Sequence, residues 1–296
     1  MFNLKEIIQN ARENKKALGH FNISNMEMLK GVLEATRECS QQLKIQIPVF
    51  IGLSESERKY IGDSAFVAYI KNWREQNNEP IFINADHCKS QVSAENATRA
   101  GFDSVVIDNS ELSLADNLEA TKKTVESIRK INANILAEGE IGFIGGSSRL
   151  LDEIPDAVAR AAEQPTTVEE TLKFVQETGV DLFAPAVGNI HGVLKKTPNP
   201  KLEIERIKQL ADALETPLVL HGGSGVAEQD IQVAIQAGIA VVHFSSDLRI
   251  AYRDGLQNLC GNYFLRHPDE IAPYRYLQPV IATLQQVVAN KLRLLN

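Results

Sequence analysis

Cysteine is scarce in this chain, and the three that occur, Cys39, Cys88 and Cys260, are scattered along it. An odd number of dispersed cysteines argues against a disulfide framework and favours a reducing compartment. No stretch is apolar for the roughly 18 residues that a membrane-spanning helix needs, and the amphipathic start of the chain lacks the apolar run of a signal peptide. We therefore expect a cytoplasmic protein with no membrane partner.

Runs of basic residues are also missing. The chain has 31 Lys and Arg against 38 Asp and Glu, which gives a net charge of −7. A nucleic-acid surface needs concentrated positive charge, so we expect no nucleic-acid partner. The 296 residues, 44% of them hydrophobic, suffice for the core of one large α/β domain.

Short apolar segments alternate with helical patterns over nearly the whole chain. Segments that are apolar on both faces and joined by helices are typical of a parallel sheet covered on both sides. About eight such units in one alternation favour closure into a (β/α)8 TIM barrel, with a doubly wound open sheet as the alternative. We expect one domain over 1–296, with strands at 17–22, 45–51, 80–85, 104–108, 134–140, 181–188, 217–222 and 239–244.

Two segments depart from this alternation. Residues 142–167 form a connection that is too long for an ordinary strand-to-helix turn and begins with glycines, so we interpret it as an active-site lid. The tail at about 266–296 ends in an amphipathic helix that either packs on the barrel or serves a subunit contact. No repeat or linker indicates a second domain.

The six histidines of the chain stand mostly where an expected strand ends. His87, His191 and His221 each follow or end a different strand, and the carboxyl ends of barrel strands share the face where active sites are built. Glu138 and Glu140 end another strand at the same level. A single histidine at a strand end is usually a hydrogen-bonded structural group. Three of them with a carboxylate match the ligands that zinc prefers, and they predict a metal site.

Asp86 immediately precedes His87. A carboxylate at the end of that strand can reach the cavity of the metal, where it is placed for proton transfer. The alternatives are a helix N-cap and a carboxylate that orients a ligand histidine.

Glycine- and serine-rich turns follow the last two expected strands. HGGSGV at 221–226 leads into a helix, and HFSSDL at 243–248 places Ser245 and Ser246 at another helix start. Free amides and the positive end of a helix dipole bind phosphate, and the loops after the seventh and eighth strands are a recurrent phosphate site of this barrel. Each serine alone would be read as an N-cap, but together they predict a phosphate site.

These motifs resemble those of the zinc-dependent class II fructose-1,6-bisphosphate and tagatose-1,6-bisphosphate aldolases. The resemblance covers nearly the whole chain, from GHFN at 19–22 to SSDLRIAY at 245–252. Between them, the segments similar to those of the family are IPVFIGLSESERKYIG, NADHCKS, FDSVVIDNS, AEGEIGFIGG, VGNIHGVLKK and LVLHGGSGV.

The resemblance implies a zinc ion held by His87, His191 and His221, with Glu140 as an alternate or structural ligand. It allows another divalent metal in place of zinc, and a monovalent cation in addition. It also implies that Asp86 exchanges a proton with the C4 hydroxyl of the substrate. A bound cation acts as a Lewis acid, which stabilises the enediolate left by carbon–carbon cleavage beside a carbonyl.

The resemblance further implies the residues that bind the substrate, a phosphorylated sugar. Asn22 and Ser54 would line the pocket. The residues implied to hold a phosphate are Gly192, Gly222, Ser224, Ser245 and Ser246. The expected assembly is a homodimer or homotetramer.

Two positions depart from the family pattern. Where the family has an acidic lid residue that handles the donor's C–H proton, this chain has Ser148, and Asp152 or Glu153 would substitute only if the lid folds differently. Where the family has Lys-x-Asn on the last strand, this chain has Val241 and His243. His243 is either a replacement acid–base group or a neutral hydrogen-bonding replacement for the amide.

We therefore predict an aldehyde-lyase that reversibly cleaves a ketose of the fructose- or tagatose-1,6-bisphosphate type to dihydroxyacetone phosphate and an aldehyde, as in glycolysis. No expected strand carries a lysine in its apolar core for a Schiff base. The alternatives are a metal-dependent sugar epimerase and a non-catalytic barrel that partners an aldolase subunit. Asp86 and the three ligand histidines favour catalysis.

Overall fold

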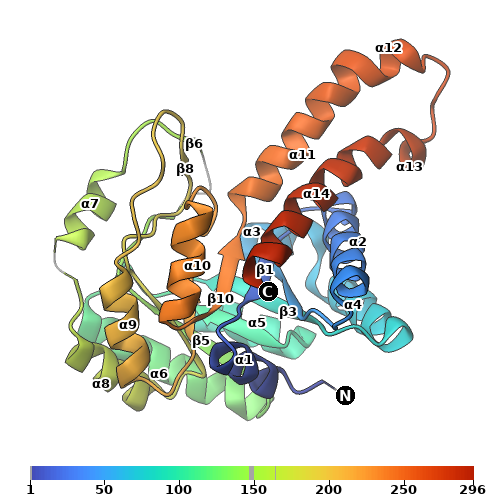
Figure 1. The fold of residues 1–296 in the computed structure, drawn as a ribbon. Helices are drawn as coiled ribbons and strands as arrows, with labels where there is room; N and C mark the ends of the chain where they lie inside the picture. The colour runs from blue at the N-terminus through green and yellow to red at the C-terminus, as the bar shows by residue number, and fades with distance from the viewer. Residues whose placement is uncertain (1, 147–149, 164) are drawn as a thin grey trace.

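The computed structural model describes residues 2–146, 150–163 and 165–296. Parallel strands close into a barrel in which neighbours follow the order β1-β10-β9-β7-β5-β4-β3-β2 (Figure 1). The barrel strands are β1 (Leu18–Asn22), β2 (Val49–Ser54), β3 (Ile81–Cys88), β4 (Ser104–Ile107), β5 (Leu136–Ile141), β7 (Leu182–Pro185), β9 (Leu218–Leu220) and β10 (Ile239–Phe244). The predicted TIM barrel is confirmed, and closure of the sheet excludes the doubly wound alternative.

Helices cover the outside of the barrel. They correspond to the amphipathic segments that the sequence shows between the strands. The longer ones are α1 (Leu4–Glu13), α2 (Met26–Leu43), α4 (Asp63–Asn77), α5 (Gln91–Ala100), α6 (Leu114–Ile131), α8 (Val168–Thr178), α9 (Ile204–Ala213) and α10 (Glu228–Ala237). A short helix, α3 (Glu55–Ile61), directly follows β2 at the mouth of the barrel.

Some strand bounds differ from the expected ones. The strand predicted at 45–51 starts later, because Lys44 ends α2 in a left-handed conformation (φ 56°) and Pro48 has no amide hydrogen for a sheet ladder. The strand predicted at 217–222 shortens to β9, so His221 lies in the loop just beyond it.

The inside of the barrel has two layers. The lower layer is an apolar floor made of Leu18, Phe50, Phe82, Leu136, Leu182, Val219 and Val241. Two residues further along their strands, the inward positions include His20, Asn84, Glu138 and His243, all of them buried. Because buried polar groups need partners, this upper layer is where a specific side-chain network forms beneath the barrel mouth.

The predicted lid, 142–167, contains a short strand and a helix. The strand β6 (Leu150–Leu151) pairs in parallel with β8 (Val193–Leu194), which lies outside the barrel in the loop that follows β7, and the helix is α7 (Asp156–Ala162). The segment is thereby tied to the loop that carries His191. Ser148, predicted to replace an acidic lid residue, lies outside the described residues.

The C-terminal region forms a helical arm that projects beyond the barrel (Figure 1). Its elements are α11 (Ser246–Asn258), the π-helical turn η1 (Leu259–Tyr263), α12 (Phe264–Arg266), α13 (Pro273–Tyr276) and α14 (Gln278–Leu295). α14 returns along α11 and packs against α2, so closely that a Cβ on Gly31 would lie 2.7 Å from the Cβ of Leu284. The amphipathic helix of the predicted tail therefore packs on the barrel wall.

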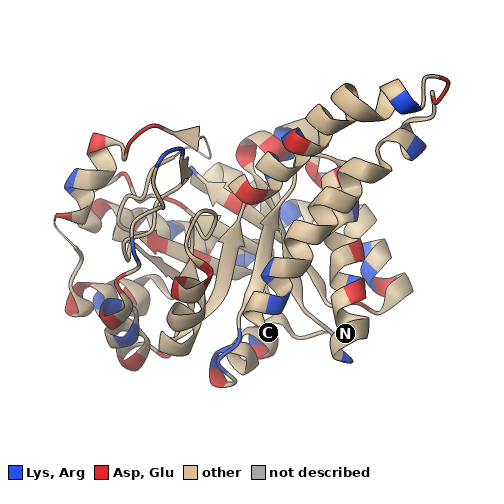
Figure 2. Cartoon of the chain, turned by 45° about the horizontal axis from the view of Figure 1, so that its top comes forward, with Lys and Arg blue, Asp and Glu red and all other residues tan. Residues whose placement is uncertain are grey.

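Positions of Lys and Arg are interspersed with positions of Asp and Glu over the outer helices in Figure 2. Among the described residues, no helix is both long enough and apolar enough to span a bilayer.

Candidate active site

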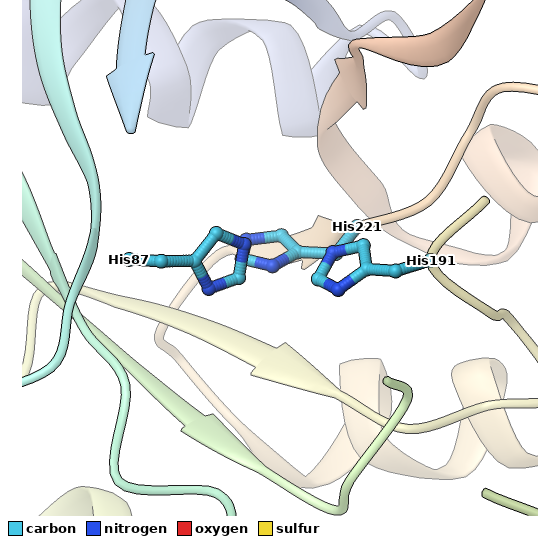
Figure 3. A group of neighbouring side chains, drawn as sticks. All are labelled: His87, His191 and His221. Atoms are coloured by element: carbon cyan, nitrogen blue, oxygen red, sulfur yellow. The ribbon is translucent and has the colours of Figure 1, made fainter. Parts of the chain in front are cut away.

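Three histidines converge at the mouth of the barrel (Figure 3). His87 lies near the end of β3, His191 in the loop after β7 and His221 directly after β9. The ring centroids of His87 lie 4.8 Å from those of His191 and 5.0 Å from those of His221, and the latter two rings are 5.9 Å apart. Each residue offers one nitrogen within 4.8 Å of the other two. The barrel thus brings together the imidazoles that the sequence analysis selected as metal ligands.

One nitrogen of each of these rings is already engaged by a neighbouring oxygen. The contacts are His87 Nδ1 with Asp108 Oδ2 at 2.7 Å, His191 Nδ1 with the backbone oxygen of Gly145 at 2.6 Å, and His221 Nε2 with Glu138 Oε1 at 2.6 Å. Where such an oxygen accepts a hydrogen bond from a ring in its neutral form, the opposite nitrogen of that ring keeps its lone pair and is free to bind a cation. The buried Nδ1 of His221 has no hydrogen-bond partner. Three free imidazole nitrogens fit a divalent cation of the zinc type.

Glu140 lies beside these rings at the end of β5. Its Oε2 atom is 3.5 Å from His87 Nδ1 and 3.5 Å from His221 Nδ1, and it is buried with no hydrogen-bond partner. Burial raises the pKa of Glu140 to about 8. His87, Asp108 and Glu140 also offer one atom each within 4.8 Å of one another. The carboxylate therefore lies beside two of the three imidazoles that the sequence analysis selected.

The charges of the three histidines differ in the metal-free protein. Burial, assisted by the neighbouring imidazolium of His87, lowers the pKa of His191 and that of His221 to about 3. Burial also disfavours the charged form of His87, but the carboxylates of Asp86 and Asp108 outweigh it and raise its pKa to about 10. At neutral pH His191 and His221 are therefore neutral, whereas His87 would have to lose a proton before it could bind a cation.

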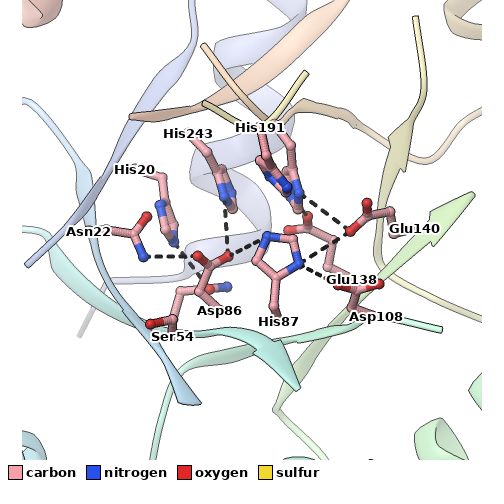
Figure 4. Close-up of polar contacts among 12 residues, drawn as sticks. His20, Asn22, Ser54, Asp86, His87, Asp108, Glu138, Glu140, His191 and His243 are labelled. Atoms are coloured by element: carbon pink, nitrogen blue, oxygen red, sulfur yellow. Dashed lines mark hydrogen bonds and ion pairs between the residues drawn. The ribbon is translucent and has the colours of Figure 1, made fainter. Parts of the chain in front are cut away.

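Asp86 faces the same cavity as His87 (Figure 4). Successive residues of a strand normally point to opposite faces. Here His87 has a left-handed φ of 50°, and the pairing of β3 with β4 shifts register between Ala85 and Cys88, so both side chains reach the mouth. Asn22 donates from Nδ2 to Asp86 Oδ2 at 2.9 Å, which leaves Oδ1 buried without a hydrogen-bond partner.

His243 stands beside this carboxylate, with Nδ1 3.5 Å from Asp86 Oδ1. Burial would raise the pKa of Asp86, but the interactions with His87 and His243 hold that pKa well below its ordinary range. Burial lowers the pKa of His243 well below its ordinary value. An ionised carboxylate and a neutral imidazole therefore stand side by side.

A cavity of about 430 Å³ opens over these groups, a size typical of small-molecule sites. The residues predicted for the site all line it except His221 and Glu140, which are buried beneath it. Asp152 instead pairs with Lys195 at 3.0 Å on the surface, and neither it nor Glu153 is among the described residues that line the cavity.

Two turns meet at the end of the cavity where a phosphate is predicted to bind. Gly222 has a φ of 66°, and a Cβ there would collide with neighbouring backbone. Ser224 Oγ accepts hydrogen bonds from the amides of Ser245 and Asp247, at 3.2 and 3.1 Å, which ties this turn to the start of α11. The buried Oγ of Ser245 has no partner, and Ser246 begins the helix. A free hydroxyl at a helix N-terminus suits an anion.

The sequence motifs do not single out three charged residues that line this cavity. Asp108 follows β4 and accepts hydrogen bonds from His87 and from Lys89 Nζ, the latter at 2.6 Å. Arg249 lies in the first turns of α11 and pairs with Glu57 at 2.7 Å. Asp108 could have been predicted, because it ends an expected strand. The ion pairs of Lys89 and Arg249 could not, because only the tertiary fold brings their partners close to them.

Known proteins are similar to this chain in sequence and in fold. Residues 2–296 match the family model described as fructose-bisphosphate aldolase class-II. The fructose-bisphosphate aldolase of Staphylococcus epidermidis is 31% identical over 298 residues, which cover 99% of this chain and 96% of that protein. The sulfofructosephosphate aldolase of Alkalicoccus urumqiensis is 33% identical over 267 residues, which cover 89% and 88%. The crystal structure of the YdjI aldolase from Escherichia coli K12 is similar with a TM-score of 0.80 at 26% identity and covers 99% of this chain and 96% of that one.

Proposed function

The chain belongs to the class II fructose-bisphosphate aldolase family, and we propose that it reversibly cleaves a ketose of the fructose- or tagatose-1,6-bisphosphate type to dihydroxyacetone phosphate and an aldehyde. A class II aldolase is an aldehyde-lyase. The observation that carries the proposal is the set of three imidazoles, each with one nitrogen engaged and one free, next to the carboxylate of Asp86.

We propose that His87, His191 and His221 hold a zinc ion, with Glu140 as an alternate ligand. Other divalent ions accept the same ligands, and a monovalent cation is a further candidate. When bound, a divalent cation supplies Lewis-acid chemistry, because it polarises the ketose carbonyl and stabilises the enediolate that cleavage leaves.

Asp86 is the proposed base for the C4 hydroxyl of the ketose. Its depressed pKa keeps it ionised at neutral pH. Asn22 holds Oδ2, so the partnerless Oδ1 is the atom that takes the proton during cleavage and returns it during condensation.

His243 is the proposed second acid–base group. It lines the cavity beside Asp86 and is neutral, so it can accept a proton from the donor carbon or donate a hydrogen bond to the developing oxyanion. This assignment supplies a group for the proton transfer that the family's acidic lid residue would perform.

The phosphate of the donor half is proposed to bind between the two turns at the end of the cavity. The proposed contacts are Gly192, Gly222, Ser224, Ser245 and Ser246, with Asn22 and Ser54 against the sugar. A sulfonated ketose phosphate is a second candidate substrate, because a sulfofructosephosphate aldolase is 33% identical to this chain.

We also propose a cytoplasmic homodimer or homotetramer. The three cysteines are free thiols, as expected for a reducing compartment.

The test is a coupled assay of triose phosphate release from fructose bisphosphate, tagatose bisphosphate and sulfofructose phosphate, with and without a chelator. The proposal predicts chelator-sensitive release from at least one of them. Bound metal with only an epimerised sugar as product would indicate the epimerase, and a chain without metal or turnover on any of the three would indicate a non-catalytic barrel.

A further inference from the structure

His20 is a fully buried histidine for which the proposed reaction has no use. It points inward from β1 in the polar layer above the apolar floor. The ring lies against Gly52 of β2, where a Cβ would collide with the Cε1 and Nε2 atoms of the imidazole and lie 3.0 Å from Nδ1. Gly52 is therefore the residue that makes room for this imidazole.

One face of the His20 ring is covered by His243. The two ring centroids are 3.5 Å apart and the planes differ by 3°. His243 in turn stacks on His221, with centroids 4.2 Å apart and planes at 24°. Three imidazoles from three strands or strand ends thus form one column, which starts at Gly52 and finishes at a proposed metal ligand.

Hydrogen bonds fix the orientation of His20 at the base of this column. Asn84 donates from Nδ2 to Ser104 Oγ at 2.7 Å, so its Oδ1 faces His20 Nε2 at 3.2 Å and accepts a hydrogen bond from it. Burial lowers the pKa of His20, so the ring is neutral and stacks on its neutral neighbour without charge repulsion.

A shared metal ion does not account for this arrangement, although His20, Asp86 and His243 offer one atom each within 4.8 Å of one another. A nitrogen lone pair lies in the plane of its ring. Because the two rings are parallel and stacked, their planes never meet, and an ion in the plane of one ring lies outside the plane of the other. The stack favours a packing role for His20 over a ligand role.

We propose that His20 is a positioning residue, which holds the His243 ring in the plane where it contacts both Asp86 and His221. Removing the His20 side chain would leave a void between Gly52 and His243, into which the second ring could rotate. The turnover readout of this inference rests on the proposed aldolase function, whereas the cobalt-spectrum readout rests only on the proposed metal site.

The test compares His20→Ala with His20→Gln, which can keep a donor to Asn84 but has no ring face. His267→Ala is the matched control, because His267 is exposed on the C-terminal arm and lines no part of the cavity. Each variant is studied in the wild-type and His243→Asn backgrounds, at a temperature where circular dichroism shows it folded. The readouts are kcat and KM of the zinc-loaded enzyme, metal stoichiometry, and the visible spectrum of the cobalt-substituted protein.

We expect both His20 variants to lower kcat about 10- to 100-fold with a smaller change in KM, the usual cost of losing a group that orients a metal site. In the His243→Asn background the same changes should alter kcat by less than about twofold, because the partner of the stack is gone. The cobalt spectrum should shift in both His20 variants and not in His267→Ala, with one metal ion per chain throughout.

Equal losses of kcat in the two backgrounds would overturn the inference, and so would full activity of His20→Gln. A second metal ion per chain that disappears in His20→Ala would make His20 a ligand instead. If the wild-type enzyme cleaves no sugar phosphate, the proposed function fails, and the cobalt spectra of His20→Ala and His267→Ala still decide the positioning role.

Discussion

Asp86 and His87 are consecutive residues of one strand, yet both side chains face the barrel mouth, with His87 Nε2 3.7 Å from Asp86 Oδ1. The cause is the left-handed φ of 50° at His87, beside a register shift in β3. Such a conformation costs a non-glycine residue on the order of 1–3 kcal/mol, and it persists where surrounding contacts hold it. The distortion places the proposed proton acceptor beside a proposed metal ligand.

Replacing Asp86 with Ala should lower kcat for cleavage by a factor of about 10² to 10⁴, the usual contribution of a general base. Zinc content should stay unchanged, because the three ligand histidines remain. Activity assays paired with metal analysis provide the check, and Asp212→Ala on the outer helix α9 serves as a control carboxylate. Full activity of the Asp86 variant would rule out the proton-transfer role.

The His243→Asn variant restores the amide that the family pattern has at this position. If His243 is an acid–base group, turnover should fall by a factor of about 100, because an amide cannot exchange protons at neutral pH. Steady-state kinetics measure the effect. Turnover that is unchanged or improved would show that the imidazole is only a neutral hydrogen-bonding replacement.

Metal affinity should rise with pH. The pKa of His87 is raised to about 10 in the metal-free protein, so below that pH the ring carries a proton that a metal has to displace. One displaced proton makes the binding constant rise about tenfold for each pH unit, until the pH reaches the pKa of His87. Competition titrations against a chelator of known affinity, at several pH values, measure this slope.

Asp108→Asn supplies the matched comparison for that titration. Asp108 lies 2.7 Å from His87 Nδ1 and helps to raise its pKa, so the variant should lower that pKa and reach its maximum affinity at a lower pH. A metal affinity that does not depend on pH in either protein would contradict the assigned protonation state of His87.

Ser245→Ala should weaken binding of the phosphorylated substrate. The Oγ of Ser245 is buried without a partner at the start of α11, and a hydrogen bond to a charged group contributes about 1.5–3 kcal/mol. KM should therefore rise about 10- to 100-fold, with kcat nearly unchanged. Inhibition by inorganic phosphate should weaken in parallel, and an unchanged inhibition constant would place the phosphate elsewhere.

The barrel and the convergence of its histidines could be predicted because both follow from pattern. Alternating strands and helices define the fold, and His87, His191 and His221 stand at strand ends that a barrel places on one rim. Asp86 was identified through its neighbour. These inferences need only the order of elements along the chain.

Other features depend on tertiary contacts that no local pattern encodes. The φ of His87 is unusual for a histidine, and β6 is a strand only because β8 lies beside it. The stack of His20 on His243 needs the absent side chain of Gly52, a residue on a different strand. Both histidines are visible in the sequence, but only the register of β1, β2 and β10 places them face to face.

The most direct test of the site is X-ray absorption spectroscopy of the zinc-loaded protein. Three imidazole nitrogens at about 2.0–2.1 Å, with the remaining coordination from oxygen, are the expected zinc shell. His191→Ala should lose one of these imidazole contributions. A shell that contains sulfur, or one that keeps all its imidazoles in the variant, would contradict the assignment of the three histidines to one ion.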